Sequence, residues 1–165
     1  MKVFFFIFLI LLTSSKILYA QNLSKAYFAG GCFWCMEESF EKINGVTEVI
    51  SGYSGGTTKN PSYKEVTYGD TGHFETIEVI YDSSTISYKK LLDNFWINID
   101  PFDEYGQFCD KGYSYRSVAF YQNQKQKILI EDNIKKIEKK FQKKVLTYIK
   151  EFDEFYKAED KHQNY

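Results

Sequence analysis

The chain has 165 residues, a length that suits one domain with an adequate hydrophobic core. Aromatic residues make up 19% of the sequence, so we expect rings both in the core and around any pocket. The net charge of −1 at pH 7 lacks the basic surplus of a nucleic-acid-binding protein, and the lysines at 135–144 fit the outer face of one helix.

The first twenty residues are typical of a secretory signal peptide. A charged start, Met1–Lys2, precedes an apolar run at 3–12, and Ala20 ends a stretch that suits cleavage. The apolar run is short for a membrane span, which takes roughly 20 residues. We therefore expect residues 1–20 to be removed on export and 21–165 to fold in the periplasm or outside the cell. An uncleaved leader would instead anchor the domain to the membrane.

Residues 30–35, Gly-Gly-Cys-Phe-Trp-Cys, lie between a strand-like run at 25–29 and a helical pattern at 36–43. This places Cys32 at a helix N-terminus, where unpaired N–H groups favour a thiolate, and predicts ionisation near neutral pH. Cys35 follows one turn later, within reach for a disulfide. Phe33 and Trp34 add apolar surface beside the sulfur. The pattern predicts redox or covalent catalysis.

The remaining segments alternate unevenly between strands and helices, and no repeat occurs. Strands are predicted at 46–53, 74–81, 115–121 and 145–149. Helices are predicted as a short turn at 63–66, a helix from Ser87 to Asp100, and a lysine-rich helix through 130–141, with loops at 54–61, 68–73 and 102–114 and an aromatic, charged tail at 152–165. We predict an α+β fold, a two-layer ferredoxin-like sandwich with a mixed, largely antiparallel sheet.

Glu75 is unusual, because strand alternation puts its carboxyl on the face of Ile77 and Val79, which should be buried. A buried carboxyl has a raised pKa and can act as a general acid. The alternative is a frayed strand end that points Glu75 into water. His73 could serve as a base for a cysteine, or be a hydrogen-bonded structural residue.

Three more polar residues, Tyr63, Asp110 and Tyr115, lie in loops or at strand ends, where sites are often assembled.

Taken together, several segments resemble the A-type peptide-methionine sulfoxide reductases. They follow the order of that family's motifs over nearly all of 21–165, which the resemblance identifies as a catalytic domain. The segments are Gly-Cys-Phe-Trp at 31–34, Asn-Pro-Ser-Tyr-Lys-Glu-Val at 60–66, Gly-Asp-Thr-Gly-His-Phe-Glu at 69–75, Asp-Lys-Gly-Tyr-Ser-Tyr-Arg-Ser at 110–117 and Ala-Glu-Asp-Lys-His-Gln-Asn-Tyr at 158–165.

The resemblance implies a role for each candidate residue. Cys32 would attack the sulfoxide sulfur and become a sulfenic acid, while Glu75 would protonate the oxygen. Phe33 and Trp34 would form the pocket for the substrate's methyl group. Tyr63 and Tyr115 would bind the oxygen through their hydroxyls, and Asp110 would help order the site. No cofactor is implied. The substrates would be oxidised proteins and free methionine sulfoxide, and we expect a monomer.

Two features depart from the family pattern. Cys109 stands where many members carry asparagine, and the cysteine-bearing tail of some members is missing. The sulfenic acid would then be resolved by Cys35, by Cys109 or directly by an external thiol. A thioredoxin-like donor outside the cytoplasm would restore the thiols.

Two other functions stay open at this stage. A thioredoxin-like dithiol oxidoreductase also places a CxxC between strand and helix, but it needs none of the later motifs. A zinc-binding module could use Cys32, Cys35, His73 and Cys109, although no second CxxC is present.

Overall fold

The computed structural model describes residues 22–164. The predicted signal peptide, residues 1–20, lies outside this range, as does Tyr165. Within 22–164, no helix has both the length and the apolar character needed to cross a membrane.

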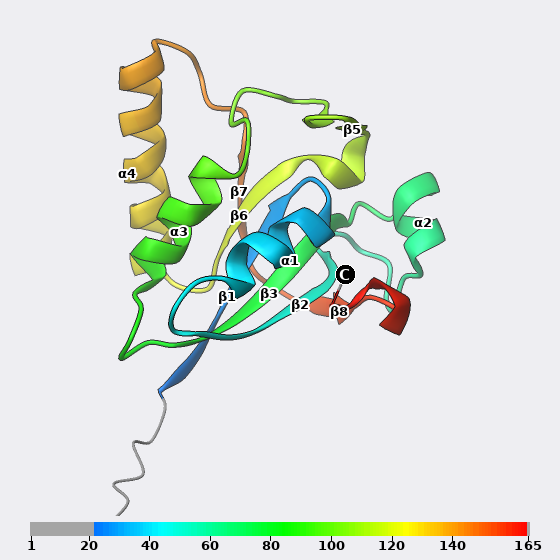
Figure 1. The fold of residues 1–165 in the computed structure, drawn as a ribbon. Coiled ribbons are helices and arrows are strands. Elements are labelled where there is room, and N and C mark those ends of the chain that lie inside the picture. Colours follow the sequence, from blue (N-terminus) through cyan, green and yellow to red (C-terminus); the bar gives the residue numbers. More distant parts are fainter. Residues whose placement is uncertain (1–21, 165) are drawn as a thin grey trace, which may run out of the picture.

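A six-stranded sheet runs through the molecule (Figure 1). Its order is β7-β6-β1-β3-β2-β8, and every neighbouring pair is antiparallel except β6 and β7. The strands are β1 (Leu23–Gly30), β2 (Val46–Ser54), β3 (Phe74–Asp82), β6 (Ser117–Tyr121), β7 (Tyr148–Glu151) and β8 (Phe155–Lys157), and a separate small hairpin joins β4 (Gly106–Gln107) to β5 (Asp110–Lys111). The helices are α1 (Phe33–Glu41), α2 (Tyr63–Tyr68), α3 (Tyr88–Ile97), α4 (Gln124–Phe141) and the 3₁₀ turns η1 (Tyr113–Tyr115) and η2 (Asp160–His162).

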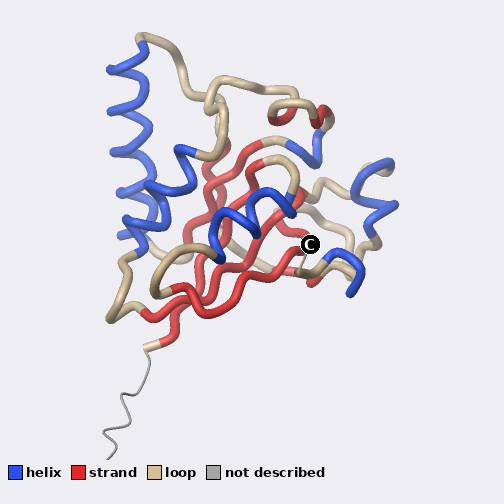
Figure 2. The backbone as a smooth tube through the Cα atoms, in the orientation of Figure 1, coloured by secondary structure: helices blue, strands red, loops and turns tan. Residues whose placement is uncertain are grey.

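Successive side chains of β1 point to opposite faces of the sheet, and both faces are apolar. On one face Phe28 stacks on Phe40 of α1 and on Phe95 of α3, with ring centroids 5.4 and 5.1 Å apart. On the other face Tyr27 stacks on Phe152, in the segment before β8, with centroids 3.6 Å apart. Helices therefore cover one face and the C-terminal segment covers part of the other. The chain's end then returns towards α1 (Figure 2).

The predicted α+β class with a mixed, largely antiparallel sheet is confirmed. The ferredoxin-like assignment stays a prediction.

Several predicted boundaries are wrong. The strand predicted at 115–121 begins at Ser117, because Gly112 and Tyr113 accept hydrogen bonds from the backbone N–H groups of Tyr115 and Arg116 and form η1. The strand predicted at 145–149 begins at Tyr148 instead, since the N–H groups at 145 and 146 bond to α4 and to the loop after α3. In the tail and the 102–114 loop, β8, η2 and the β4–β5 hairpin were not predicted.

Candidate active site

Cys32 is the N-cap residue of α1, as predicted, and only Gly31 separates it from the end of β1. The turn between the two elements depends on Gly31, which has a φ of +85°. A Cβ on Gly31 would also lie 2.6 Å from the Cβ of Gln107, so only glycine fits there. The Cys32 side chain is half-buried, whereas Cys35, one turn along α1, is exposed.

The expectation of a readily ionised Cys32 is wrong for the resting site. Burial raises the pKa of the Cys32 thiol to about 11, and the N–H groups of Cys35 and Trp34 lower it by less than burial raises it. The nearby Cys35 and Glu75 also raise this pKa. Cys32 is therefore a thiol at neutral pH, and the helix N-terminus alone does not make it a thiolate.

Glu75 lies under the start of α1, with only 2% of its surface exposed. Its Oε2 accepts a hydrogen bond of 3.1 Å from the backbone N–H of Phe33. Burial raises the pKa of Glu75 to about 7, with Asp110 adding to the increase and the Phe33 N–H and the Tyr115 hydroxyl opposing it. The predicted buried carboxyl is confirmed, and a frayed strand end is excluded.

Tyr63 and Tyr115 come from α2 and η1 and meet at their hydroxyl groups. Burial, followed by the hydrogen bond with Tyr63, raises the pKa of Tyr115, and the negative charge of Glu75 raises it further. Both side chains are partly exposed. The Tyr115 hydroxyl therefore lies beside both the Tyr63 hydroxyl and the Glu75 carboxyl, where the two hydroxyls can bind an oxygen atom.

Four rings gather next to these hydroxyls. Phe33 lies 5.8 Å from Trp34 and 6.2 Å from Tyr63, measured between centroids. His162 lies 5.5 Å from both Phe33 and Trp34 and only 4.4 Å from Tyr63. Sequence reasoning missed His162 as a site residue. The available signal was that it belongs to the family-like segment at 158–165.

All three cysteines line one cavity of about 260 Å³, which also includes Asp110 and Phe108. Cys109 and Asp110 reach it from the β4–β5 hairpin, where both are exposed. The structure thus brings Asp110 to the same cavity as Cys32, and each of the three thiols is free.

His73 is not part of this site. Its Nδ1 accepts a hydrogen bond of 3.1 Å from the N–H of Gly56, and its Nε2 lies 2.7 Å from the carbonyl oxygen of Thr58. The imidazole therefore holds the glycine-rich loop. The prediction that His73 is a hydrogen-bonded structural residue is confirmed, and the prediction that it is a base for a cysteine is wrong. Both ring nitrogens are occupied, so His73 does not complete a zinc site with the cysteines. Within residues 22–164 no cluster of three or more potential ligands is placed to hold a metal.

Comparison with known proteins supports the sulfoxide interpretation over a thioredoxin-like one. Residues 24–165 match the family model described as peptide methionine sulfoxide reductase. A peptide methionine sulfoxide reductase MsrA of Listeria monocytogenes is 46% identical over 147 residues, covering 88% of this chain and 83% of the relative. Methionine sulfoxide reductase A of Corynebacterium diphtheriae has a similar structure, with a TM-score of 0.79 at 30% identity over 87% of this chain and 73% of that one. The structure of Mxr1 from Saccharomyces cerevisiae in reduced form is also similar, with a TM-score of 0.79 at 30% identity over 86% of this chain and 82% of that one.

Proposed function

The chain belongs to the peptide methionine sulfoxide reductase family, and on that premise we propose that it reduces the S epimer of methionine sulfoxide. Its substrates are oxidised proteins and the free amino acid, and thiols supply the electrons. The observation that carries the proposal is the Glu75 carboxyl, buried against the N–H of Phe33 with its pKa raised to about 7. A sulfoxide oxygen cannot leave without a proton, and Glu75 is a buried acid beside the nucleophile.

In the first step the sulfur of Cys32 attacks the sulfoxide sulfur. Glu75 gives its proton to the sulfoxide oxygen, and the proton lost by the Cys32 thiol restores the acid. The attack forms a bond between the two sulfur atoms. The protonated oxygen then passes to the Cys32 sulfur as this S–S bond and the S–O bond of the substrate break, so methionine leaves and a Cys32 sulfenic acid remains. The hydroxyls of Tyr63 and Tyr115 bind the oxygen, and the rings of Phe33 and Trp34 receive the methyl group.

In the second step a thiol attacks the sulfenic acid, forms a disulfide and releases water. We rank Cys35 first, since it lies one turn from Cys32 and a disulfide needs only local adjustment there. Cys109 ranks second, and its place at the same cavity supports keeping it as a candidate. Direct attack by an external thiol ranks third.

A dithiol protein of the thioredoxin type then reduces the disulfide, since Cys35 and Cys109 are both exposed to such a partner. We propose that this takes place outside the cytoplasm, on the basis of the leader sequence at 1–20. The enzyme works as a monomer, because one chain supplies every residue of the proposed site.

A single-turnover experiment tests the function. The reduced full chain is mixed with one equivalent of either epimer of methionine sulfoxide, without external reductant, and methionine is quantified. We expect close to one equivalent of methionine from the S epimer, almost none from the R epimer, and none with Cys32→Ser. Absence of methionine with the unmodified protein would overturn the activity, and equal yields from both epimers would overturn the stereochemistry.

A further inference from the structure

The C-terminal segment 158–164 is fastened to the elements that build the site. The side-chain amide of Gln163 makes two hydrogen bonds with the backbone of Ser51 in β2. It accepts one of 3.1 Å from the Ser51 N–H and donates one of 2.9 Å to the Ser51 carbonyl oxygen. Asn164 donates its N–H to Glu37 of α1 at 2.7 Å, and that buried carboxylate also accepts a hydrogen bond from the Ser51 hydroxyl. The segment therefore has a defined position relative to both α1 and β2.

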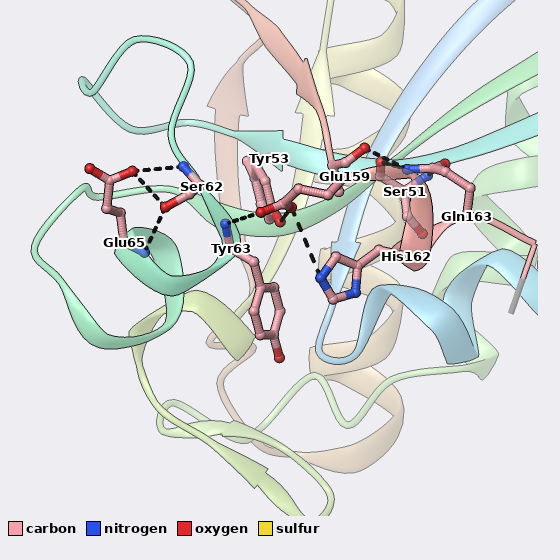
Figure 3. Close-up of polar contacts among 9 residues, drawn as sticks. Ser51, Tyr53, Ser62, Tyr63, Glu65, Glu159, His162 and Gln163 are labelled. Atoms are coloured by element: carbon pink, nitrogen blue, oxygen red, sulfur yellow. Dashed lines mark hydrogen bonds and ion pairs between the residues drawn. The ribbon is translucent and has the colours of Figure 1, made fainter.

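Within this segment, the carboxylate of Glu159 bridges two elements of the site (Figure 3). One oxygen accepts a hydrogen bond of 2.9 Å from the hydroxyl of Tyr53 in β2. The other accepts a hydrogen bond of 3.0 Å from the backbone N–H of Tyr63 in α2. Burial raises the pKa of Glu159, but these two hydrogen bonds, together with one from its own backbone N–H and the nearby His162, hold the pKa below its usual value.

The N–H of Tyr63 is a group that α2 leaves without a partner of its own. Ser62 and Glu65 form a capping box, in which the Ser62 hydroxyl accepts from the Glu65 N–H and the Glu65 carboxylate accepts from the Ser62 N–H. Neither bond involves the N–H of Tyr63, one of the four donors that a helix start leaves unpaired. Glu159 supplies that acceptor, and so it fixes the residue that carries the phenol.

The same segment also holds the ring of Tyr63. His162 packs on it with centroids 4.4 Å apart, at an interplanar angle of 33°. Burial lowers the pKa of His162, so a neutral imidazole forms this contact at neutral pH. Tyr63 is thus held at its N–H by Glu159, at its ring by His162 and at its hydroxyl by Tyr115.

From this geometry we infer that Glu159 is a positioning residue of the reductase, one that sets the orientation of Tyr63 towards the sulfoxide oxygen. The inference rests on the proposed function and extends it to the C-terminal segment. In Glu159→Gln the negative charge is lost and the amide has a single acceptor oxygen. If the NH₂ group faces the Tyr63 N–H, the backbone tether is lost. If it faces Tyr53, that hydroxyl must reverse and accept, and the Tyr63 N–H keeps only a neutral hydrogen bond, about half as strong as the charge-assisted one.

The test compares Glu159→Gln with Asp160→Asn, a matched control. Asp160 is the next acid in the segment, but its side chain is fully exposed and only pairs with Lys157 at 3.9 Å. At saturating S sulfoxide, the single-turnover rate constant should fall about tenfold in Glu159→Gln, the size expected when a charge-assisted hydrogen bond is replaced by a neutral one or lost. Asp160→Asn should stay within twofold of the unmodified protein. A Glu159→Gln rate that matches the control overturns the inference.

Two further readouts separate positioning from general loosening of the segment. If Glu159 acts through the Tyr63 hydroxyl, adding Glu159→Gln to Tyr63→Phe should lower the single-turnover rate constant less than twofold. If Glu159→Gln instead detaches the whole C-terminal segment, it should lower the rate constant equally in the unmodified protein and in Tyr63→Phe. In the protein without substrate, the ring signal of ¹³C-labelled Tyr63, assigned by its loss in Tyr63→Phe, should shift in Glu159→Gln but not in Asp160→Asn. An unmoved signal overturns the positioning role. The NMR signal does not depend on turnover. A wrong positioning role, shown by an unmoved signal, is therefore distinguishable from a wrong function, shown by the absence of methionine with the unmodified protein.

Discussion

Glu75 has its carboxyl pKa raised to about 7, so at neutral pH roughly half of the molecules hold the proton that the reaction requires. The first step should therefore slow as pH rises through 7 and Glu75 loses this proton. Glu75→Gln cannot donate, so we expect its rate constant to fall about 10²–10⁴-fold. Rapid-quench measurement of methionine between pH 5.5 and 8.5 checks both points, and a rate in Glu75→Gln close to that of the unmodified protein would refute the assigned acid.

Cys32 should react with alkylating agents as a buried thiol, because burial raises its pKa to about 11. The rate of Cys32 modification by iodoacetamide, followed by peptide mass spectrometry, should still be rising at pH 9. Glu75→Gln should shift this profile to lower pH, since Glu75 raises the pKa of Cys32. Glu38→Gln is the control, because that exposed carboxylate of α1 pairs with Lys42. An unshifted profile in Glu75→Gln would show that the carboxylate does not act on the thiol.

At the scale of elements, the first turn of α1 and the β4–β5 hairpin each offer a thiol that could resolve the sulfenic acid. Cys35 lies one turn from Cys32 in α1, whereas Cys109 lines the shared cavity from the hairpin. We expect Cys35→Ser to complete one turnover, accumulate sulfenic acid and fail to recycle with a dithiol protein. Cys109→Ser should behave like the unmodified protein.

A sulfenic-acid trapping reagent, with detection by mass spectrometry, compares the two variants directly. Trapped adduct in Cys109→Ser alone would reverse the order and assign resolution to the hairpin. Adduct in both variants and in the unmodified protein would favour a cycle in which the external thiol attacks Cys32.

The helix and strand patterns explain why some elements were predictable. Strands near 25–29, 46–53 and 74–81 and the helix after Cys32 follow local hydrophobic periodicity, and the structure contains each of them. Tyr115 was placed in a strand because a 3₁₀ turn with one buried residue has no period to detect. Strands β7 and β8 have no fully buried residue, so burial leaves no pattern in their sequence.

At the scale of the whole molecule, the site is assembled from pieces far apart in the chain. Local patterns identified Cys32 and suggested the burial of Glu75, while the roles of Tyr63 and Tyr115 came from family resemblance. Neither approach revealed that His162 packs against the ring of Tyr63, because that contact depends on the path of the tail around the sheet. The raised pKa of Cys32 was missed for the same reason, since desolvation is a property of the packed site.

The location of the molecule is the remaining prediction at this scale. The apolar run at 3–12, between a charged start and Ala20, predicts export. A fusion of residues 1–22 to a reporter that is active only outside the cytoplasm should give a signal. The same fusion with two charged residues inside the apolar run should give none, since charges lower the affinity of that run for the membrane. N-terminal sequencing of the exported protein should then begin at Gln21. A silent reporter, together with an intact Met1 on the native protein, would place the enzyme in the cytoplasm, where cytosolic dithiol proteins could reduce it directly.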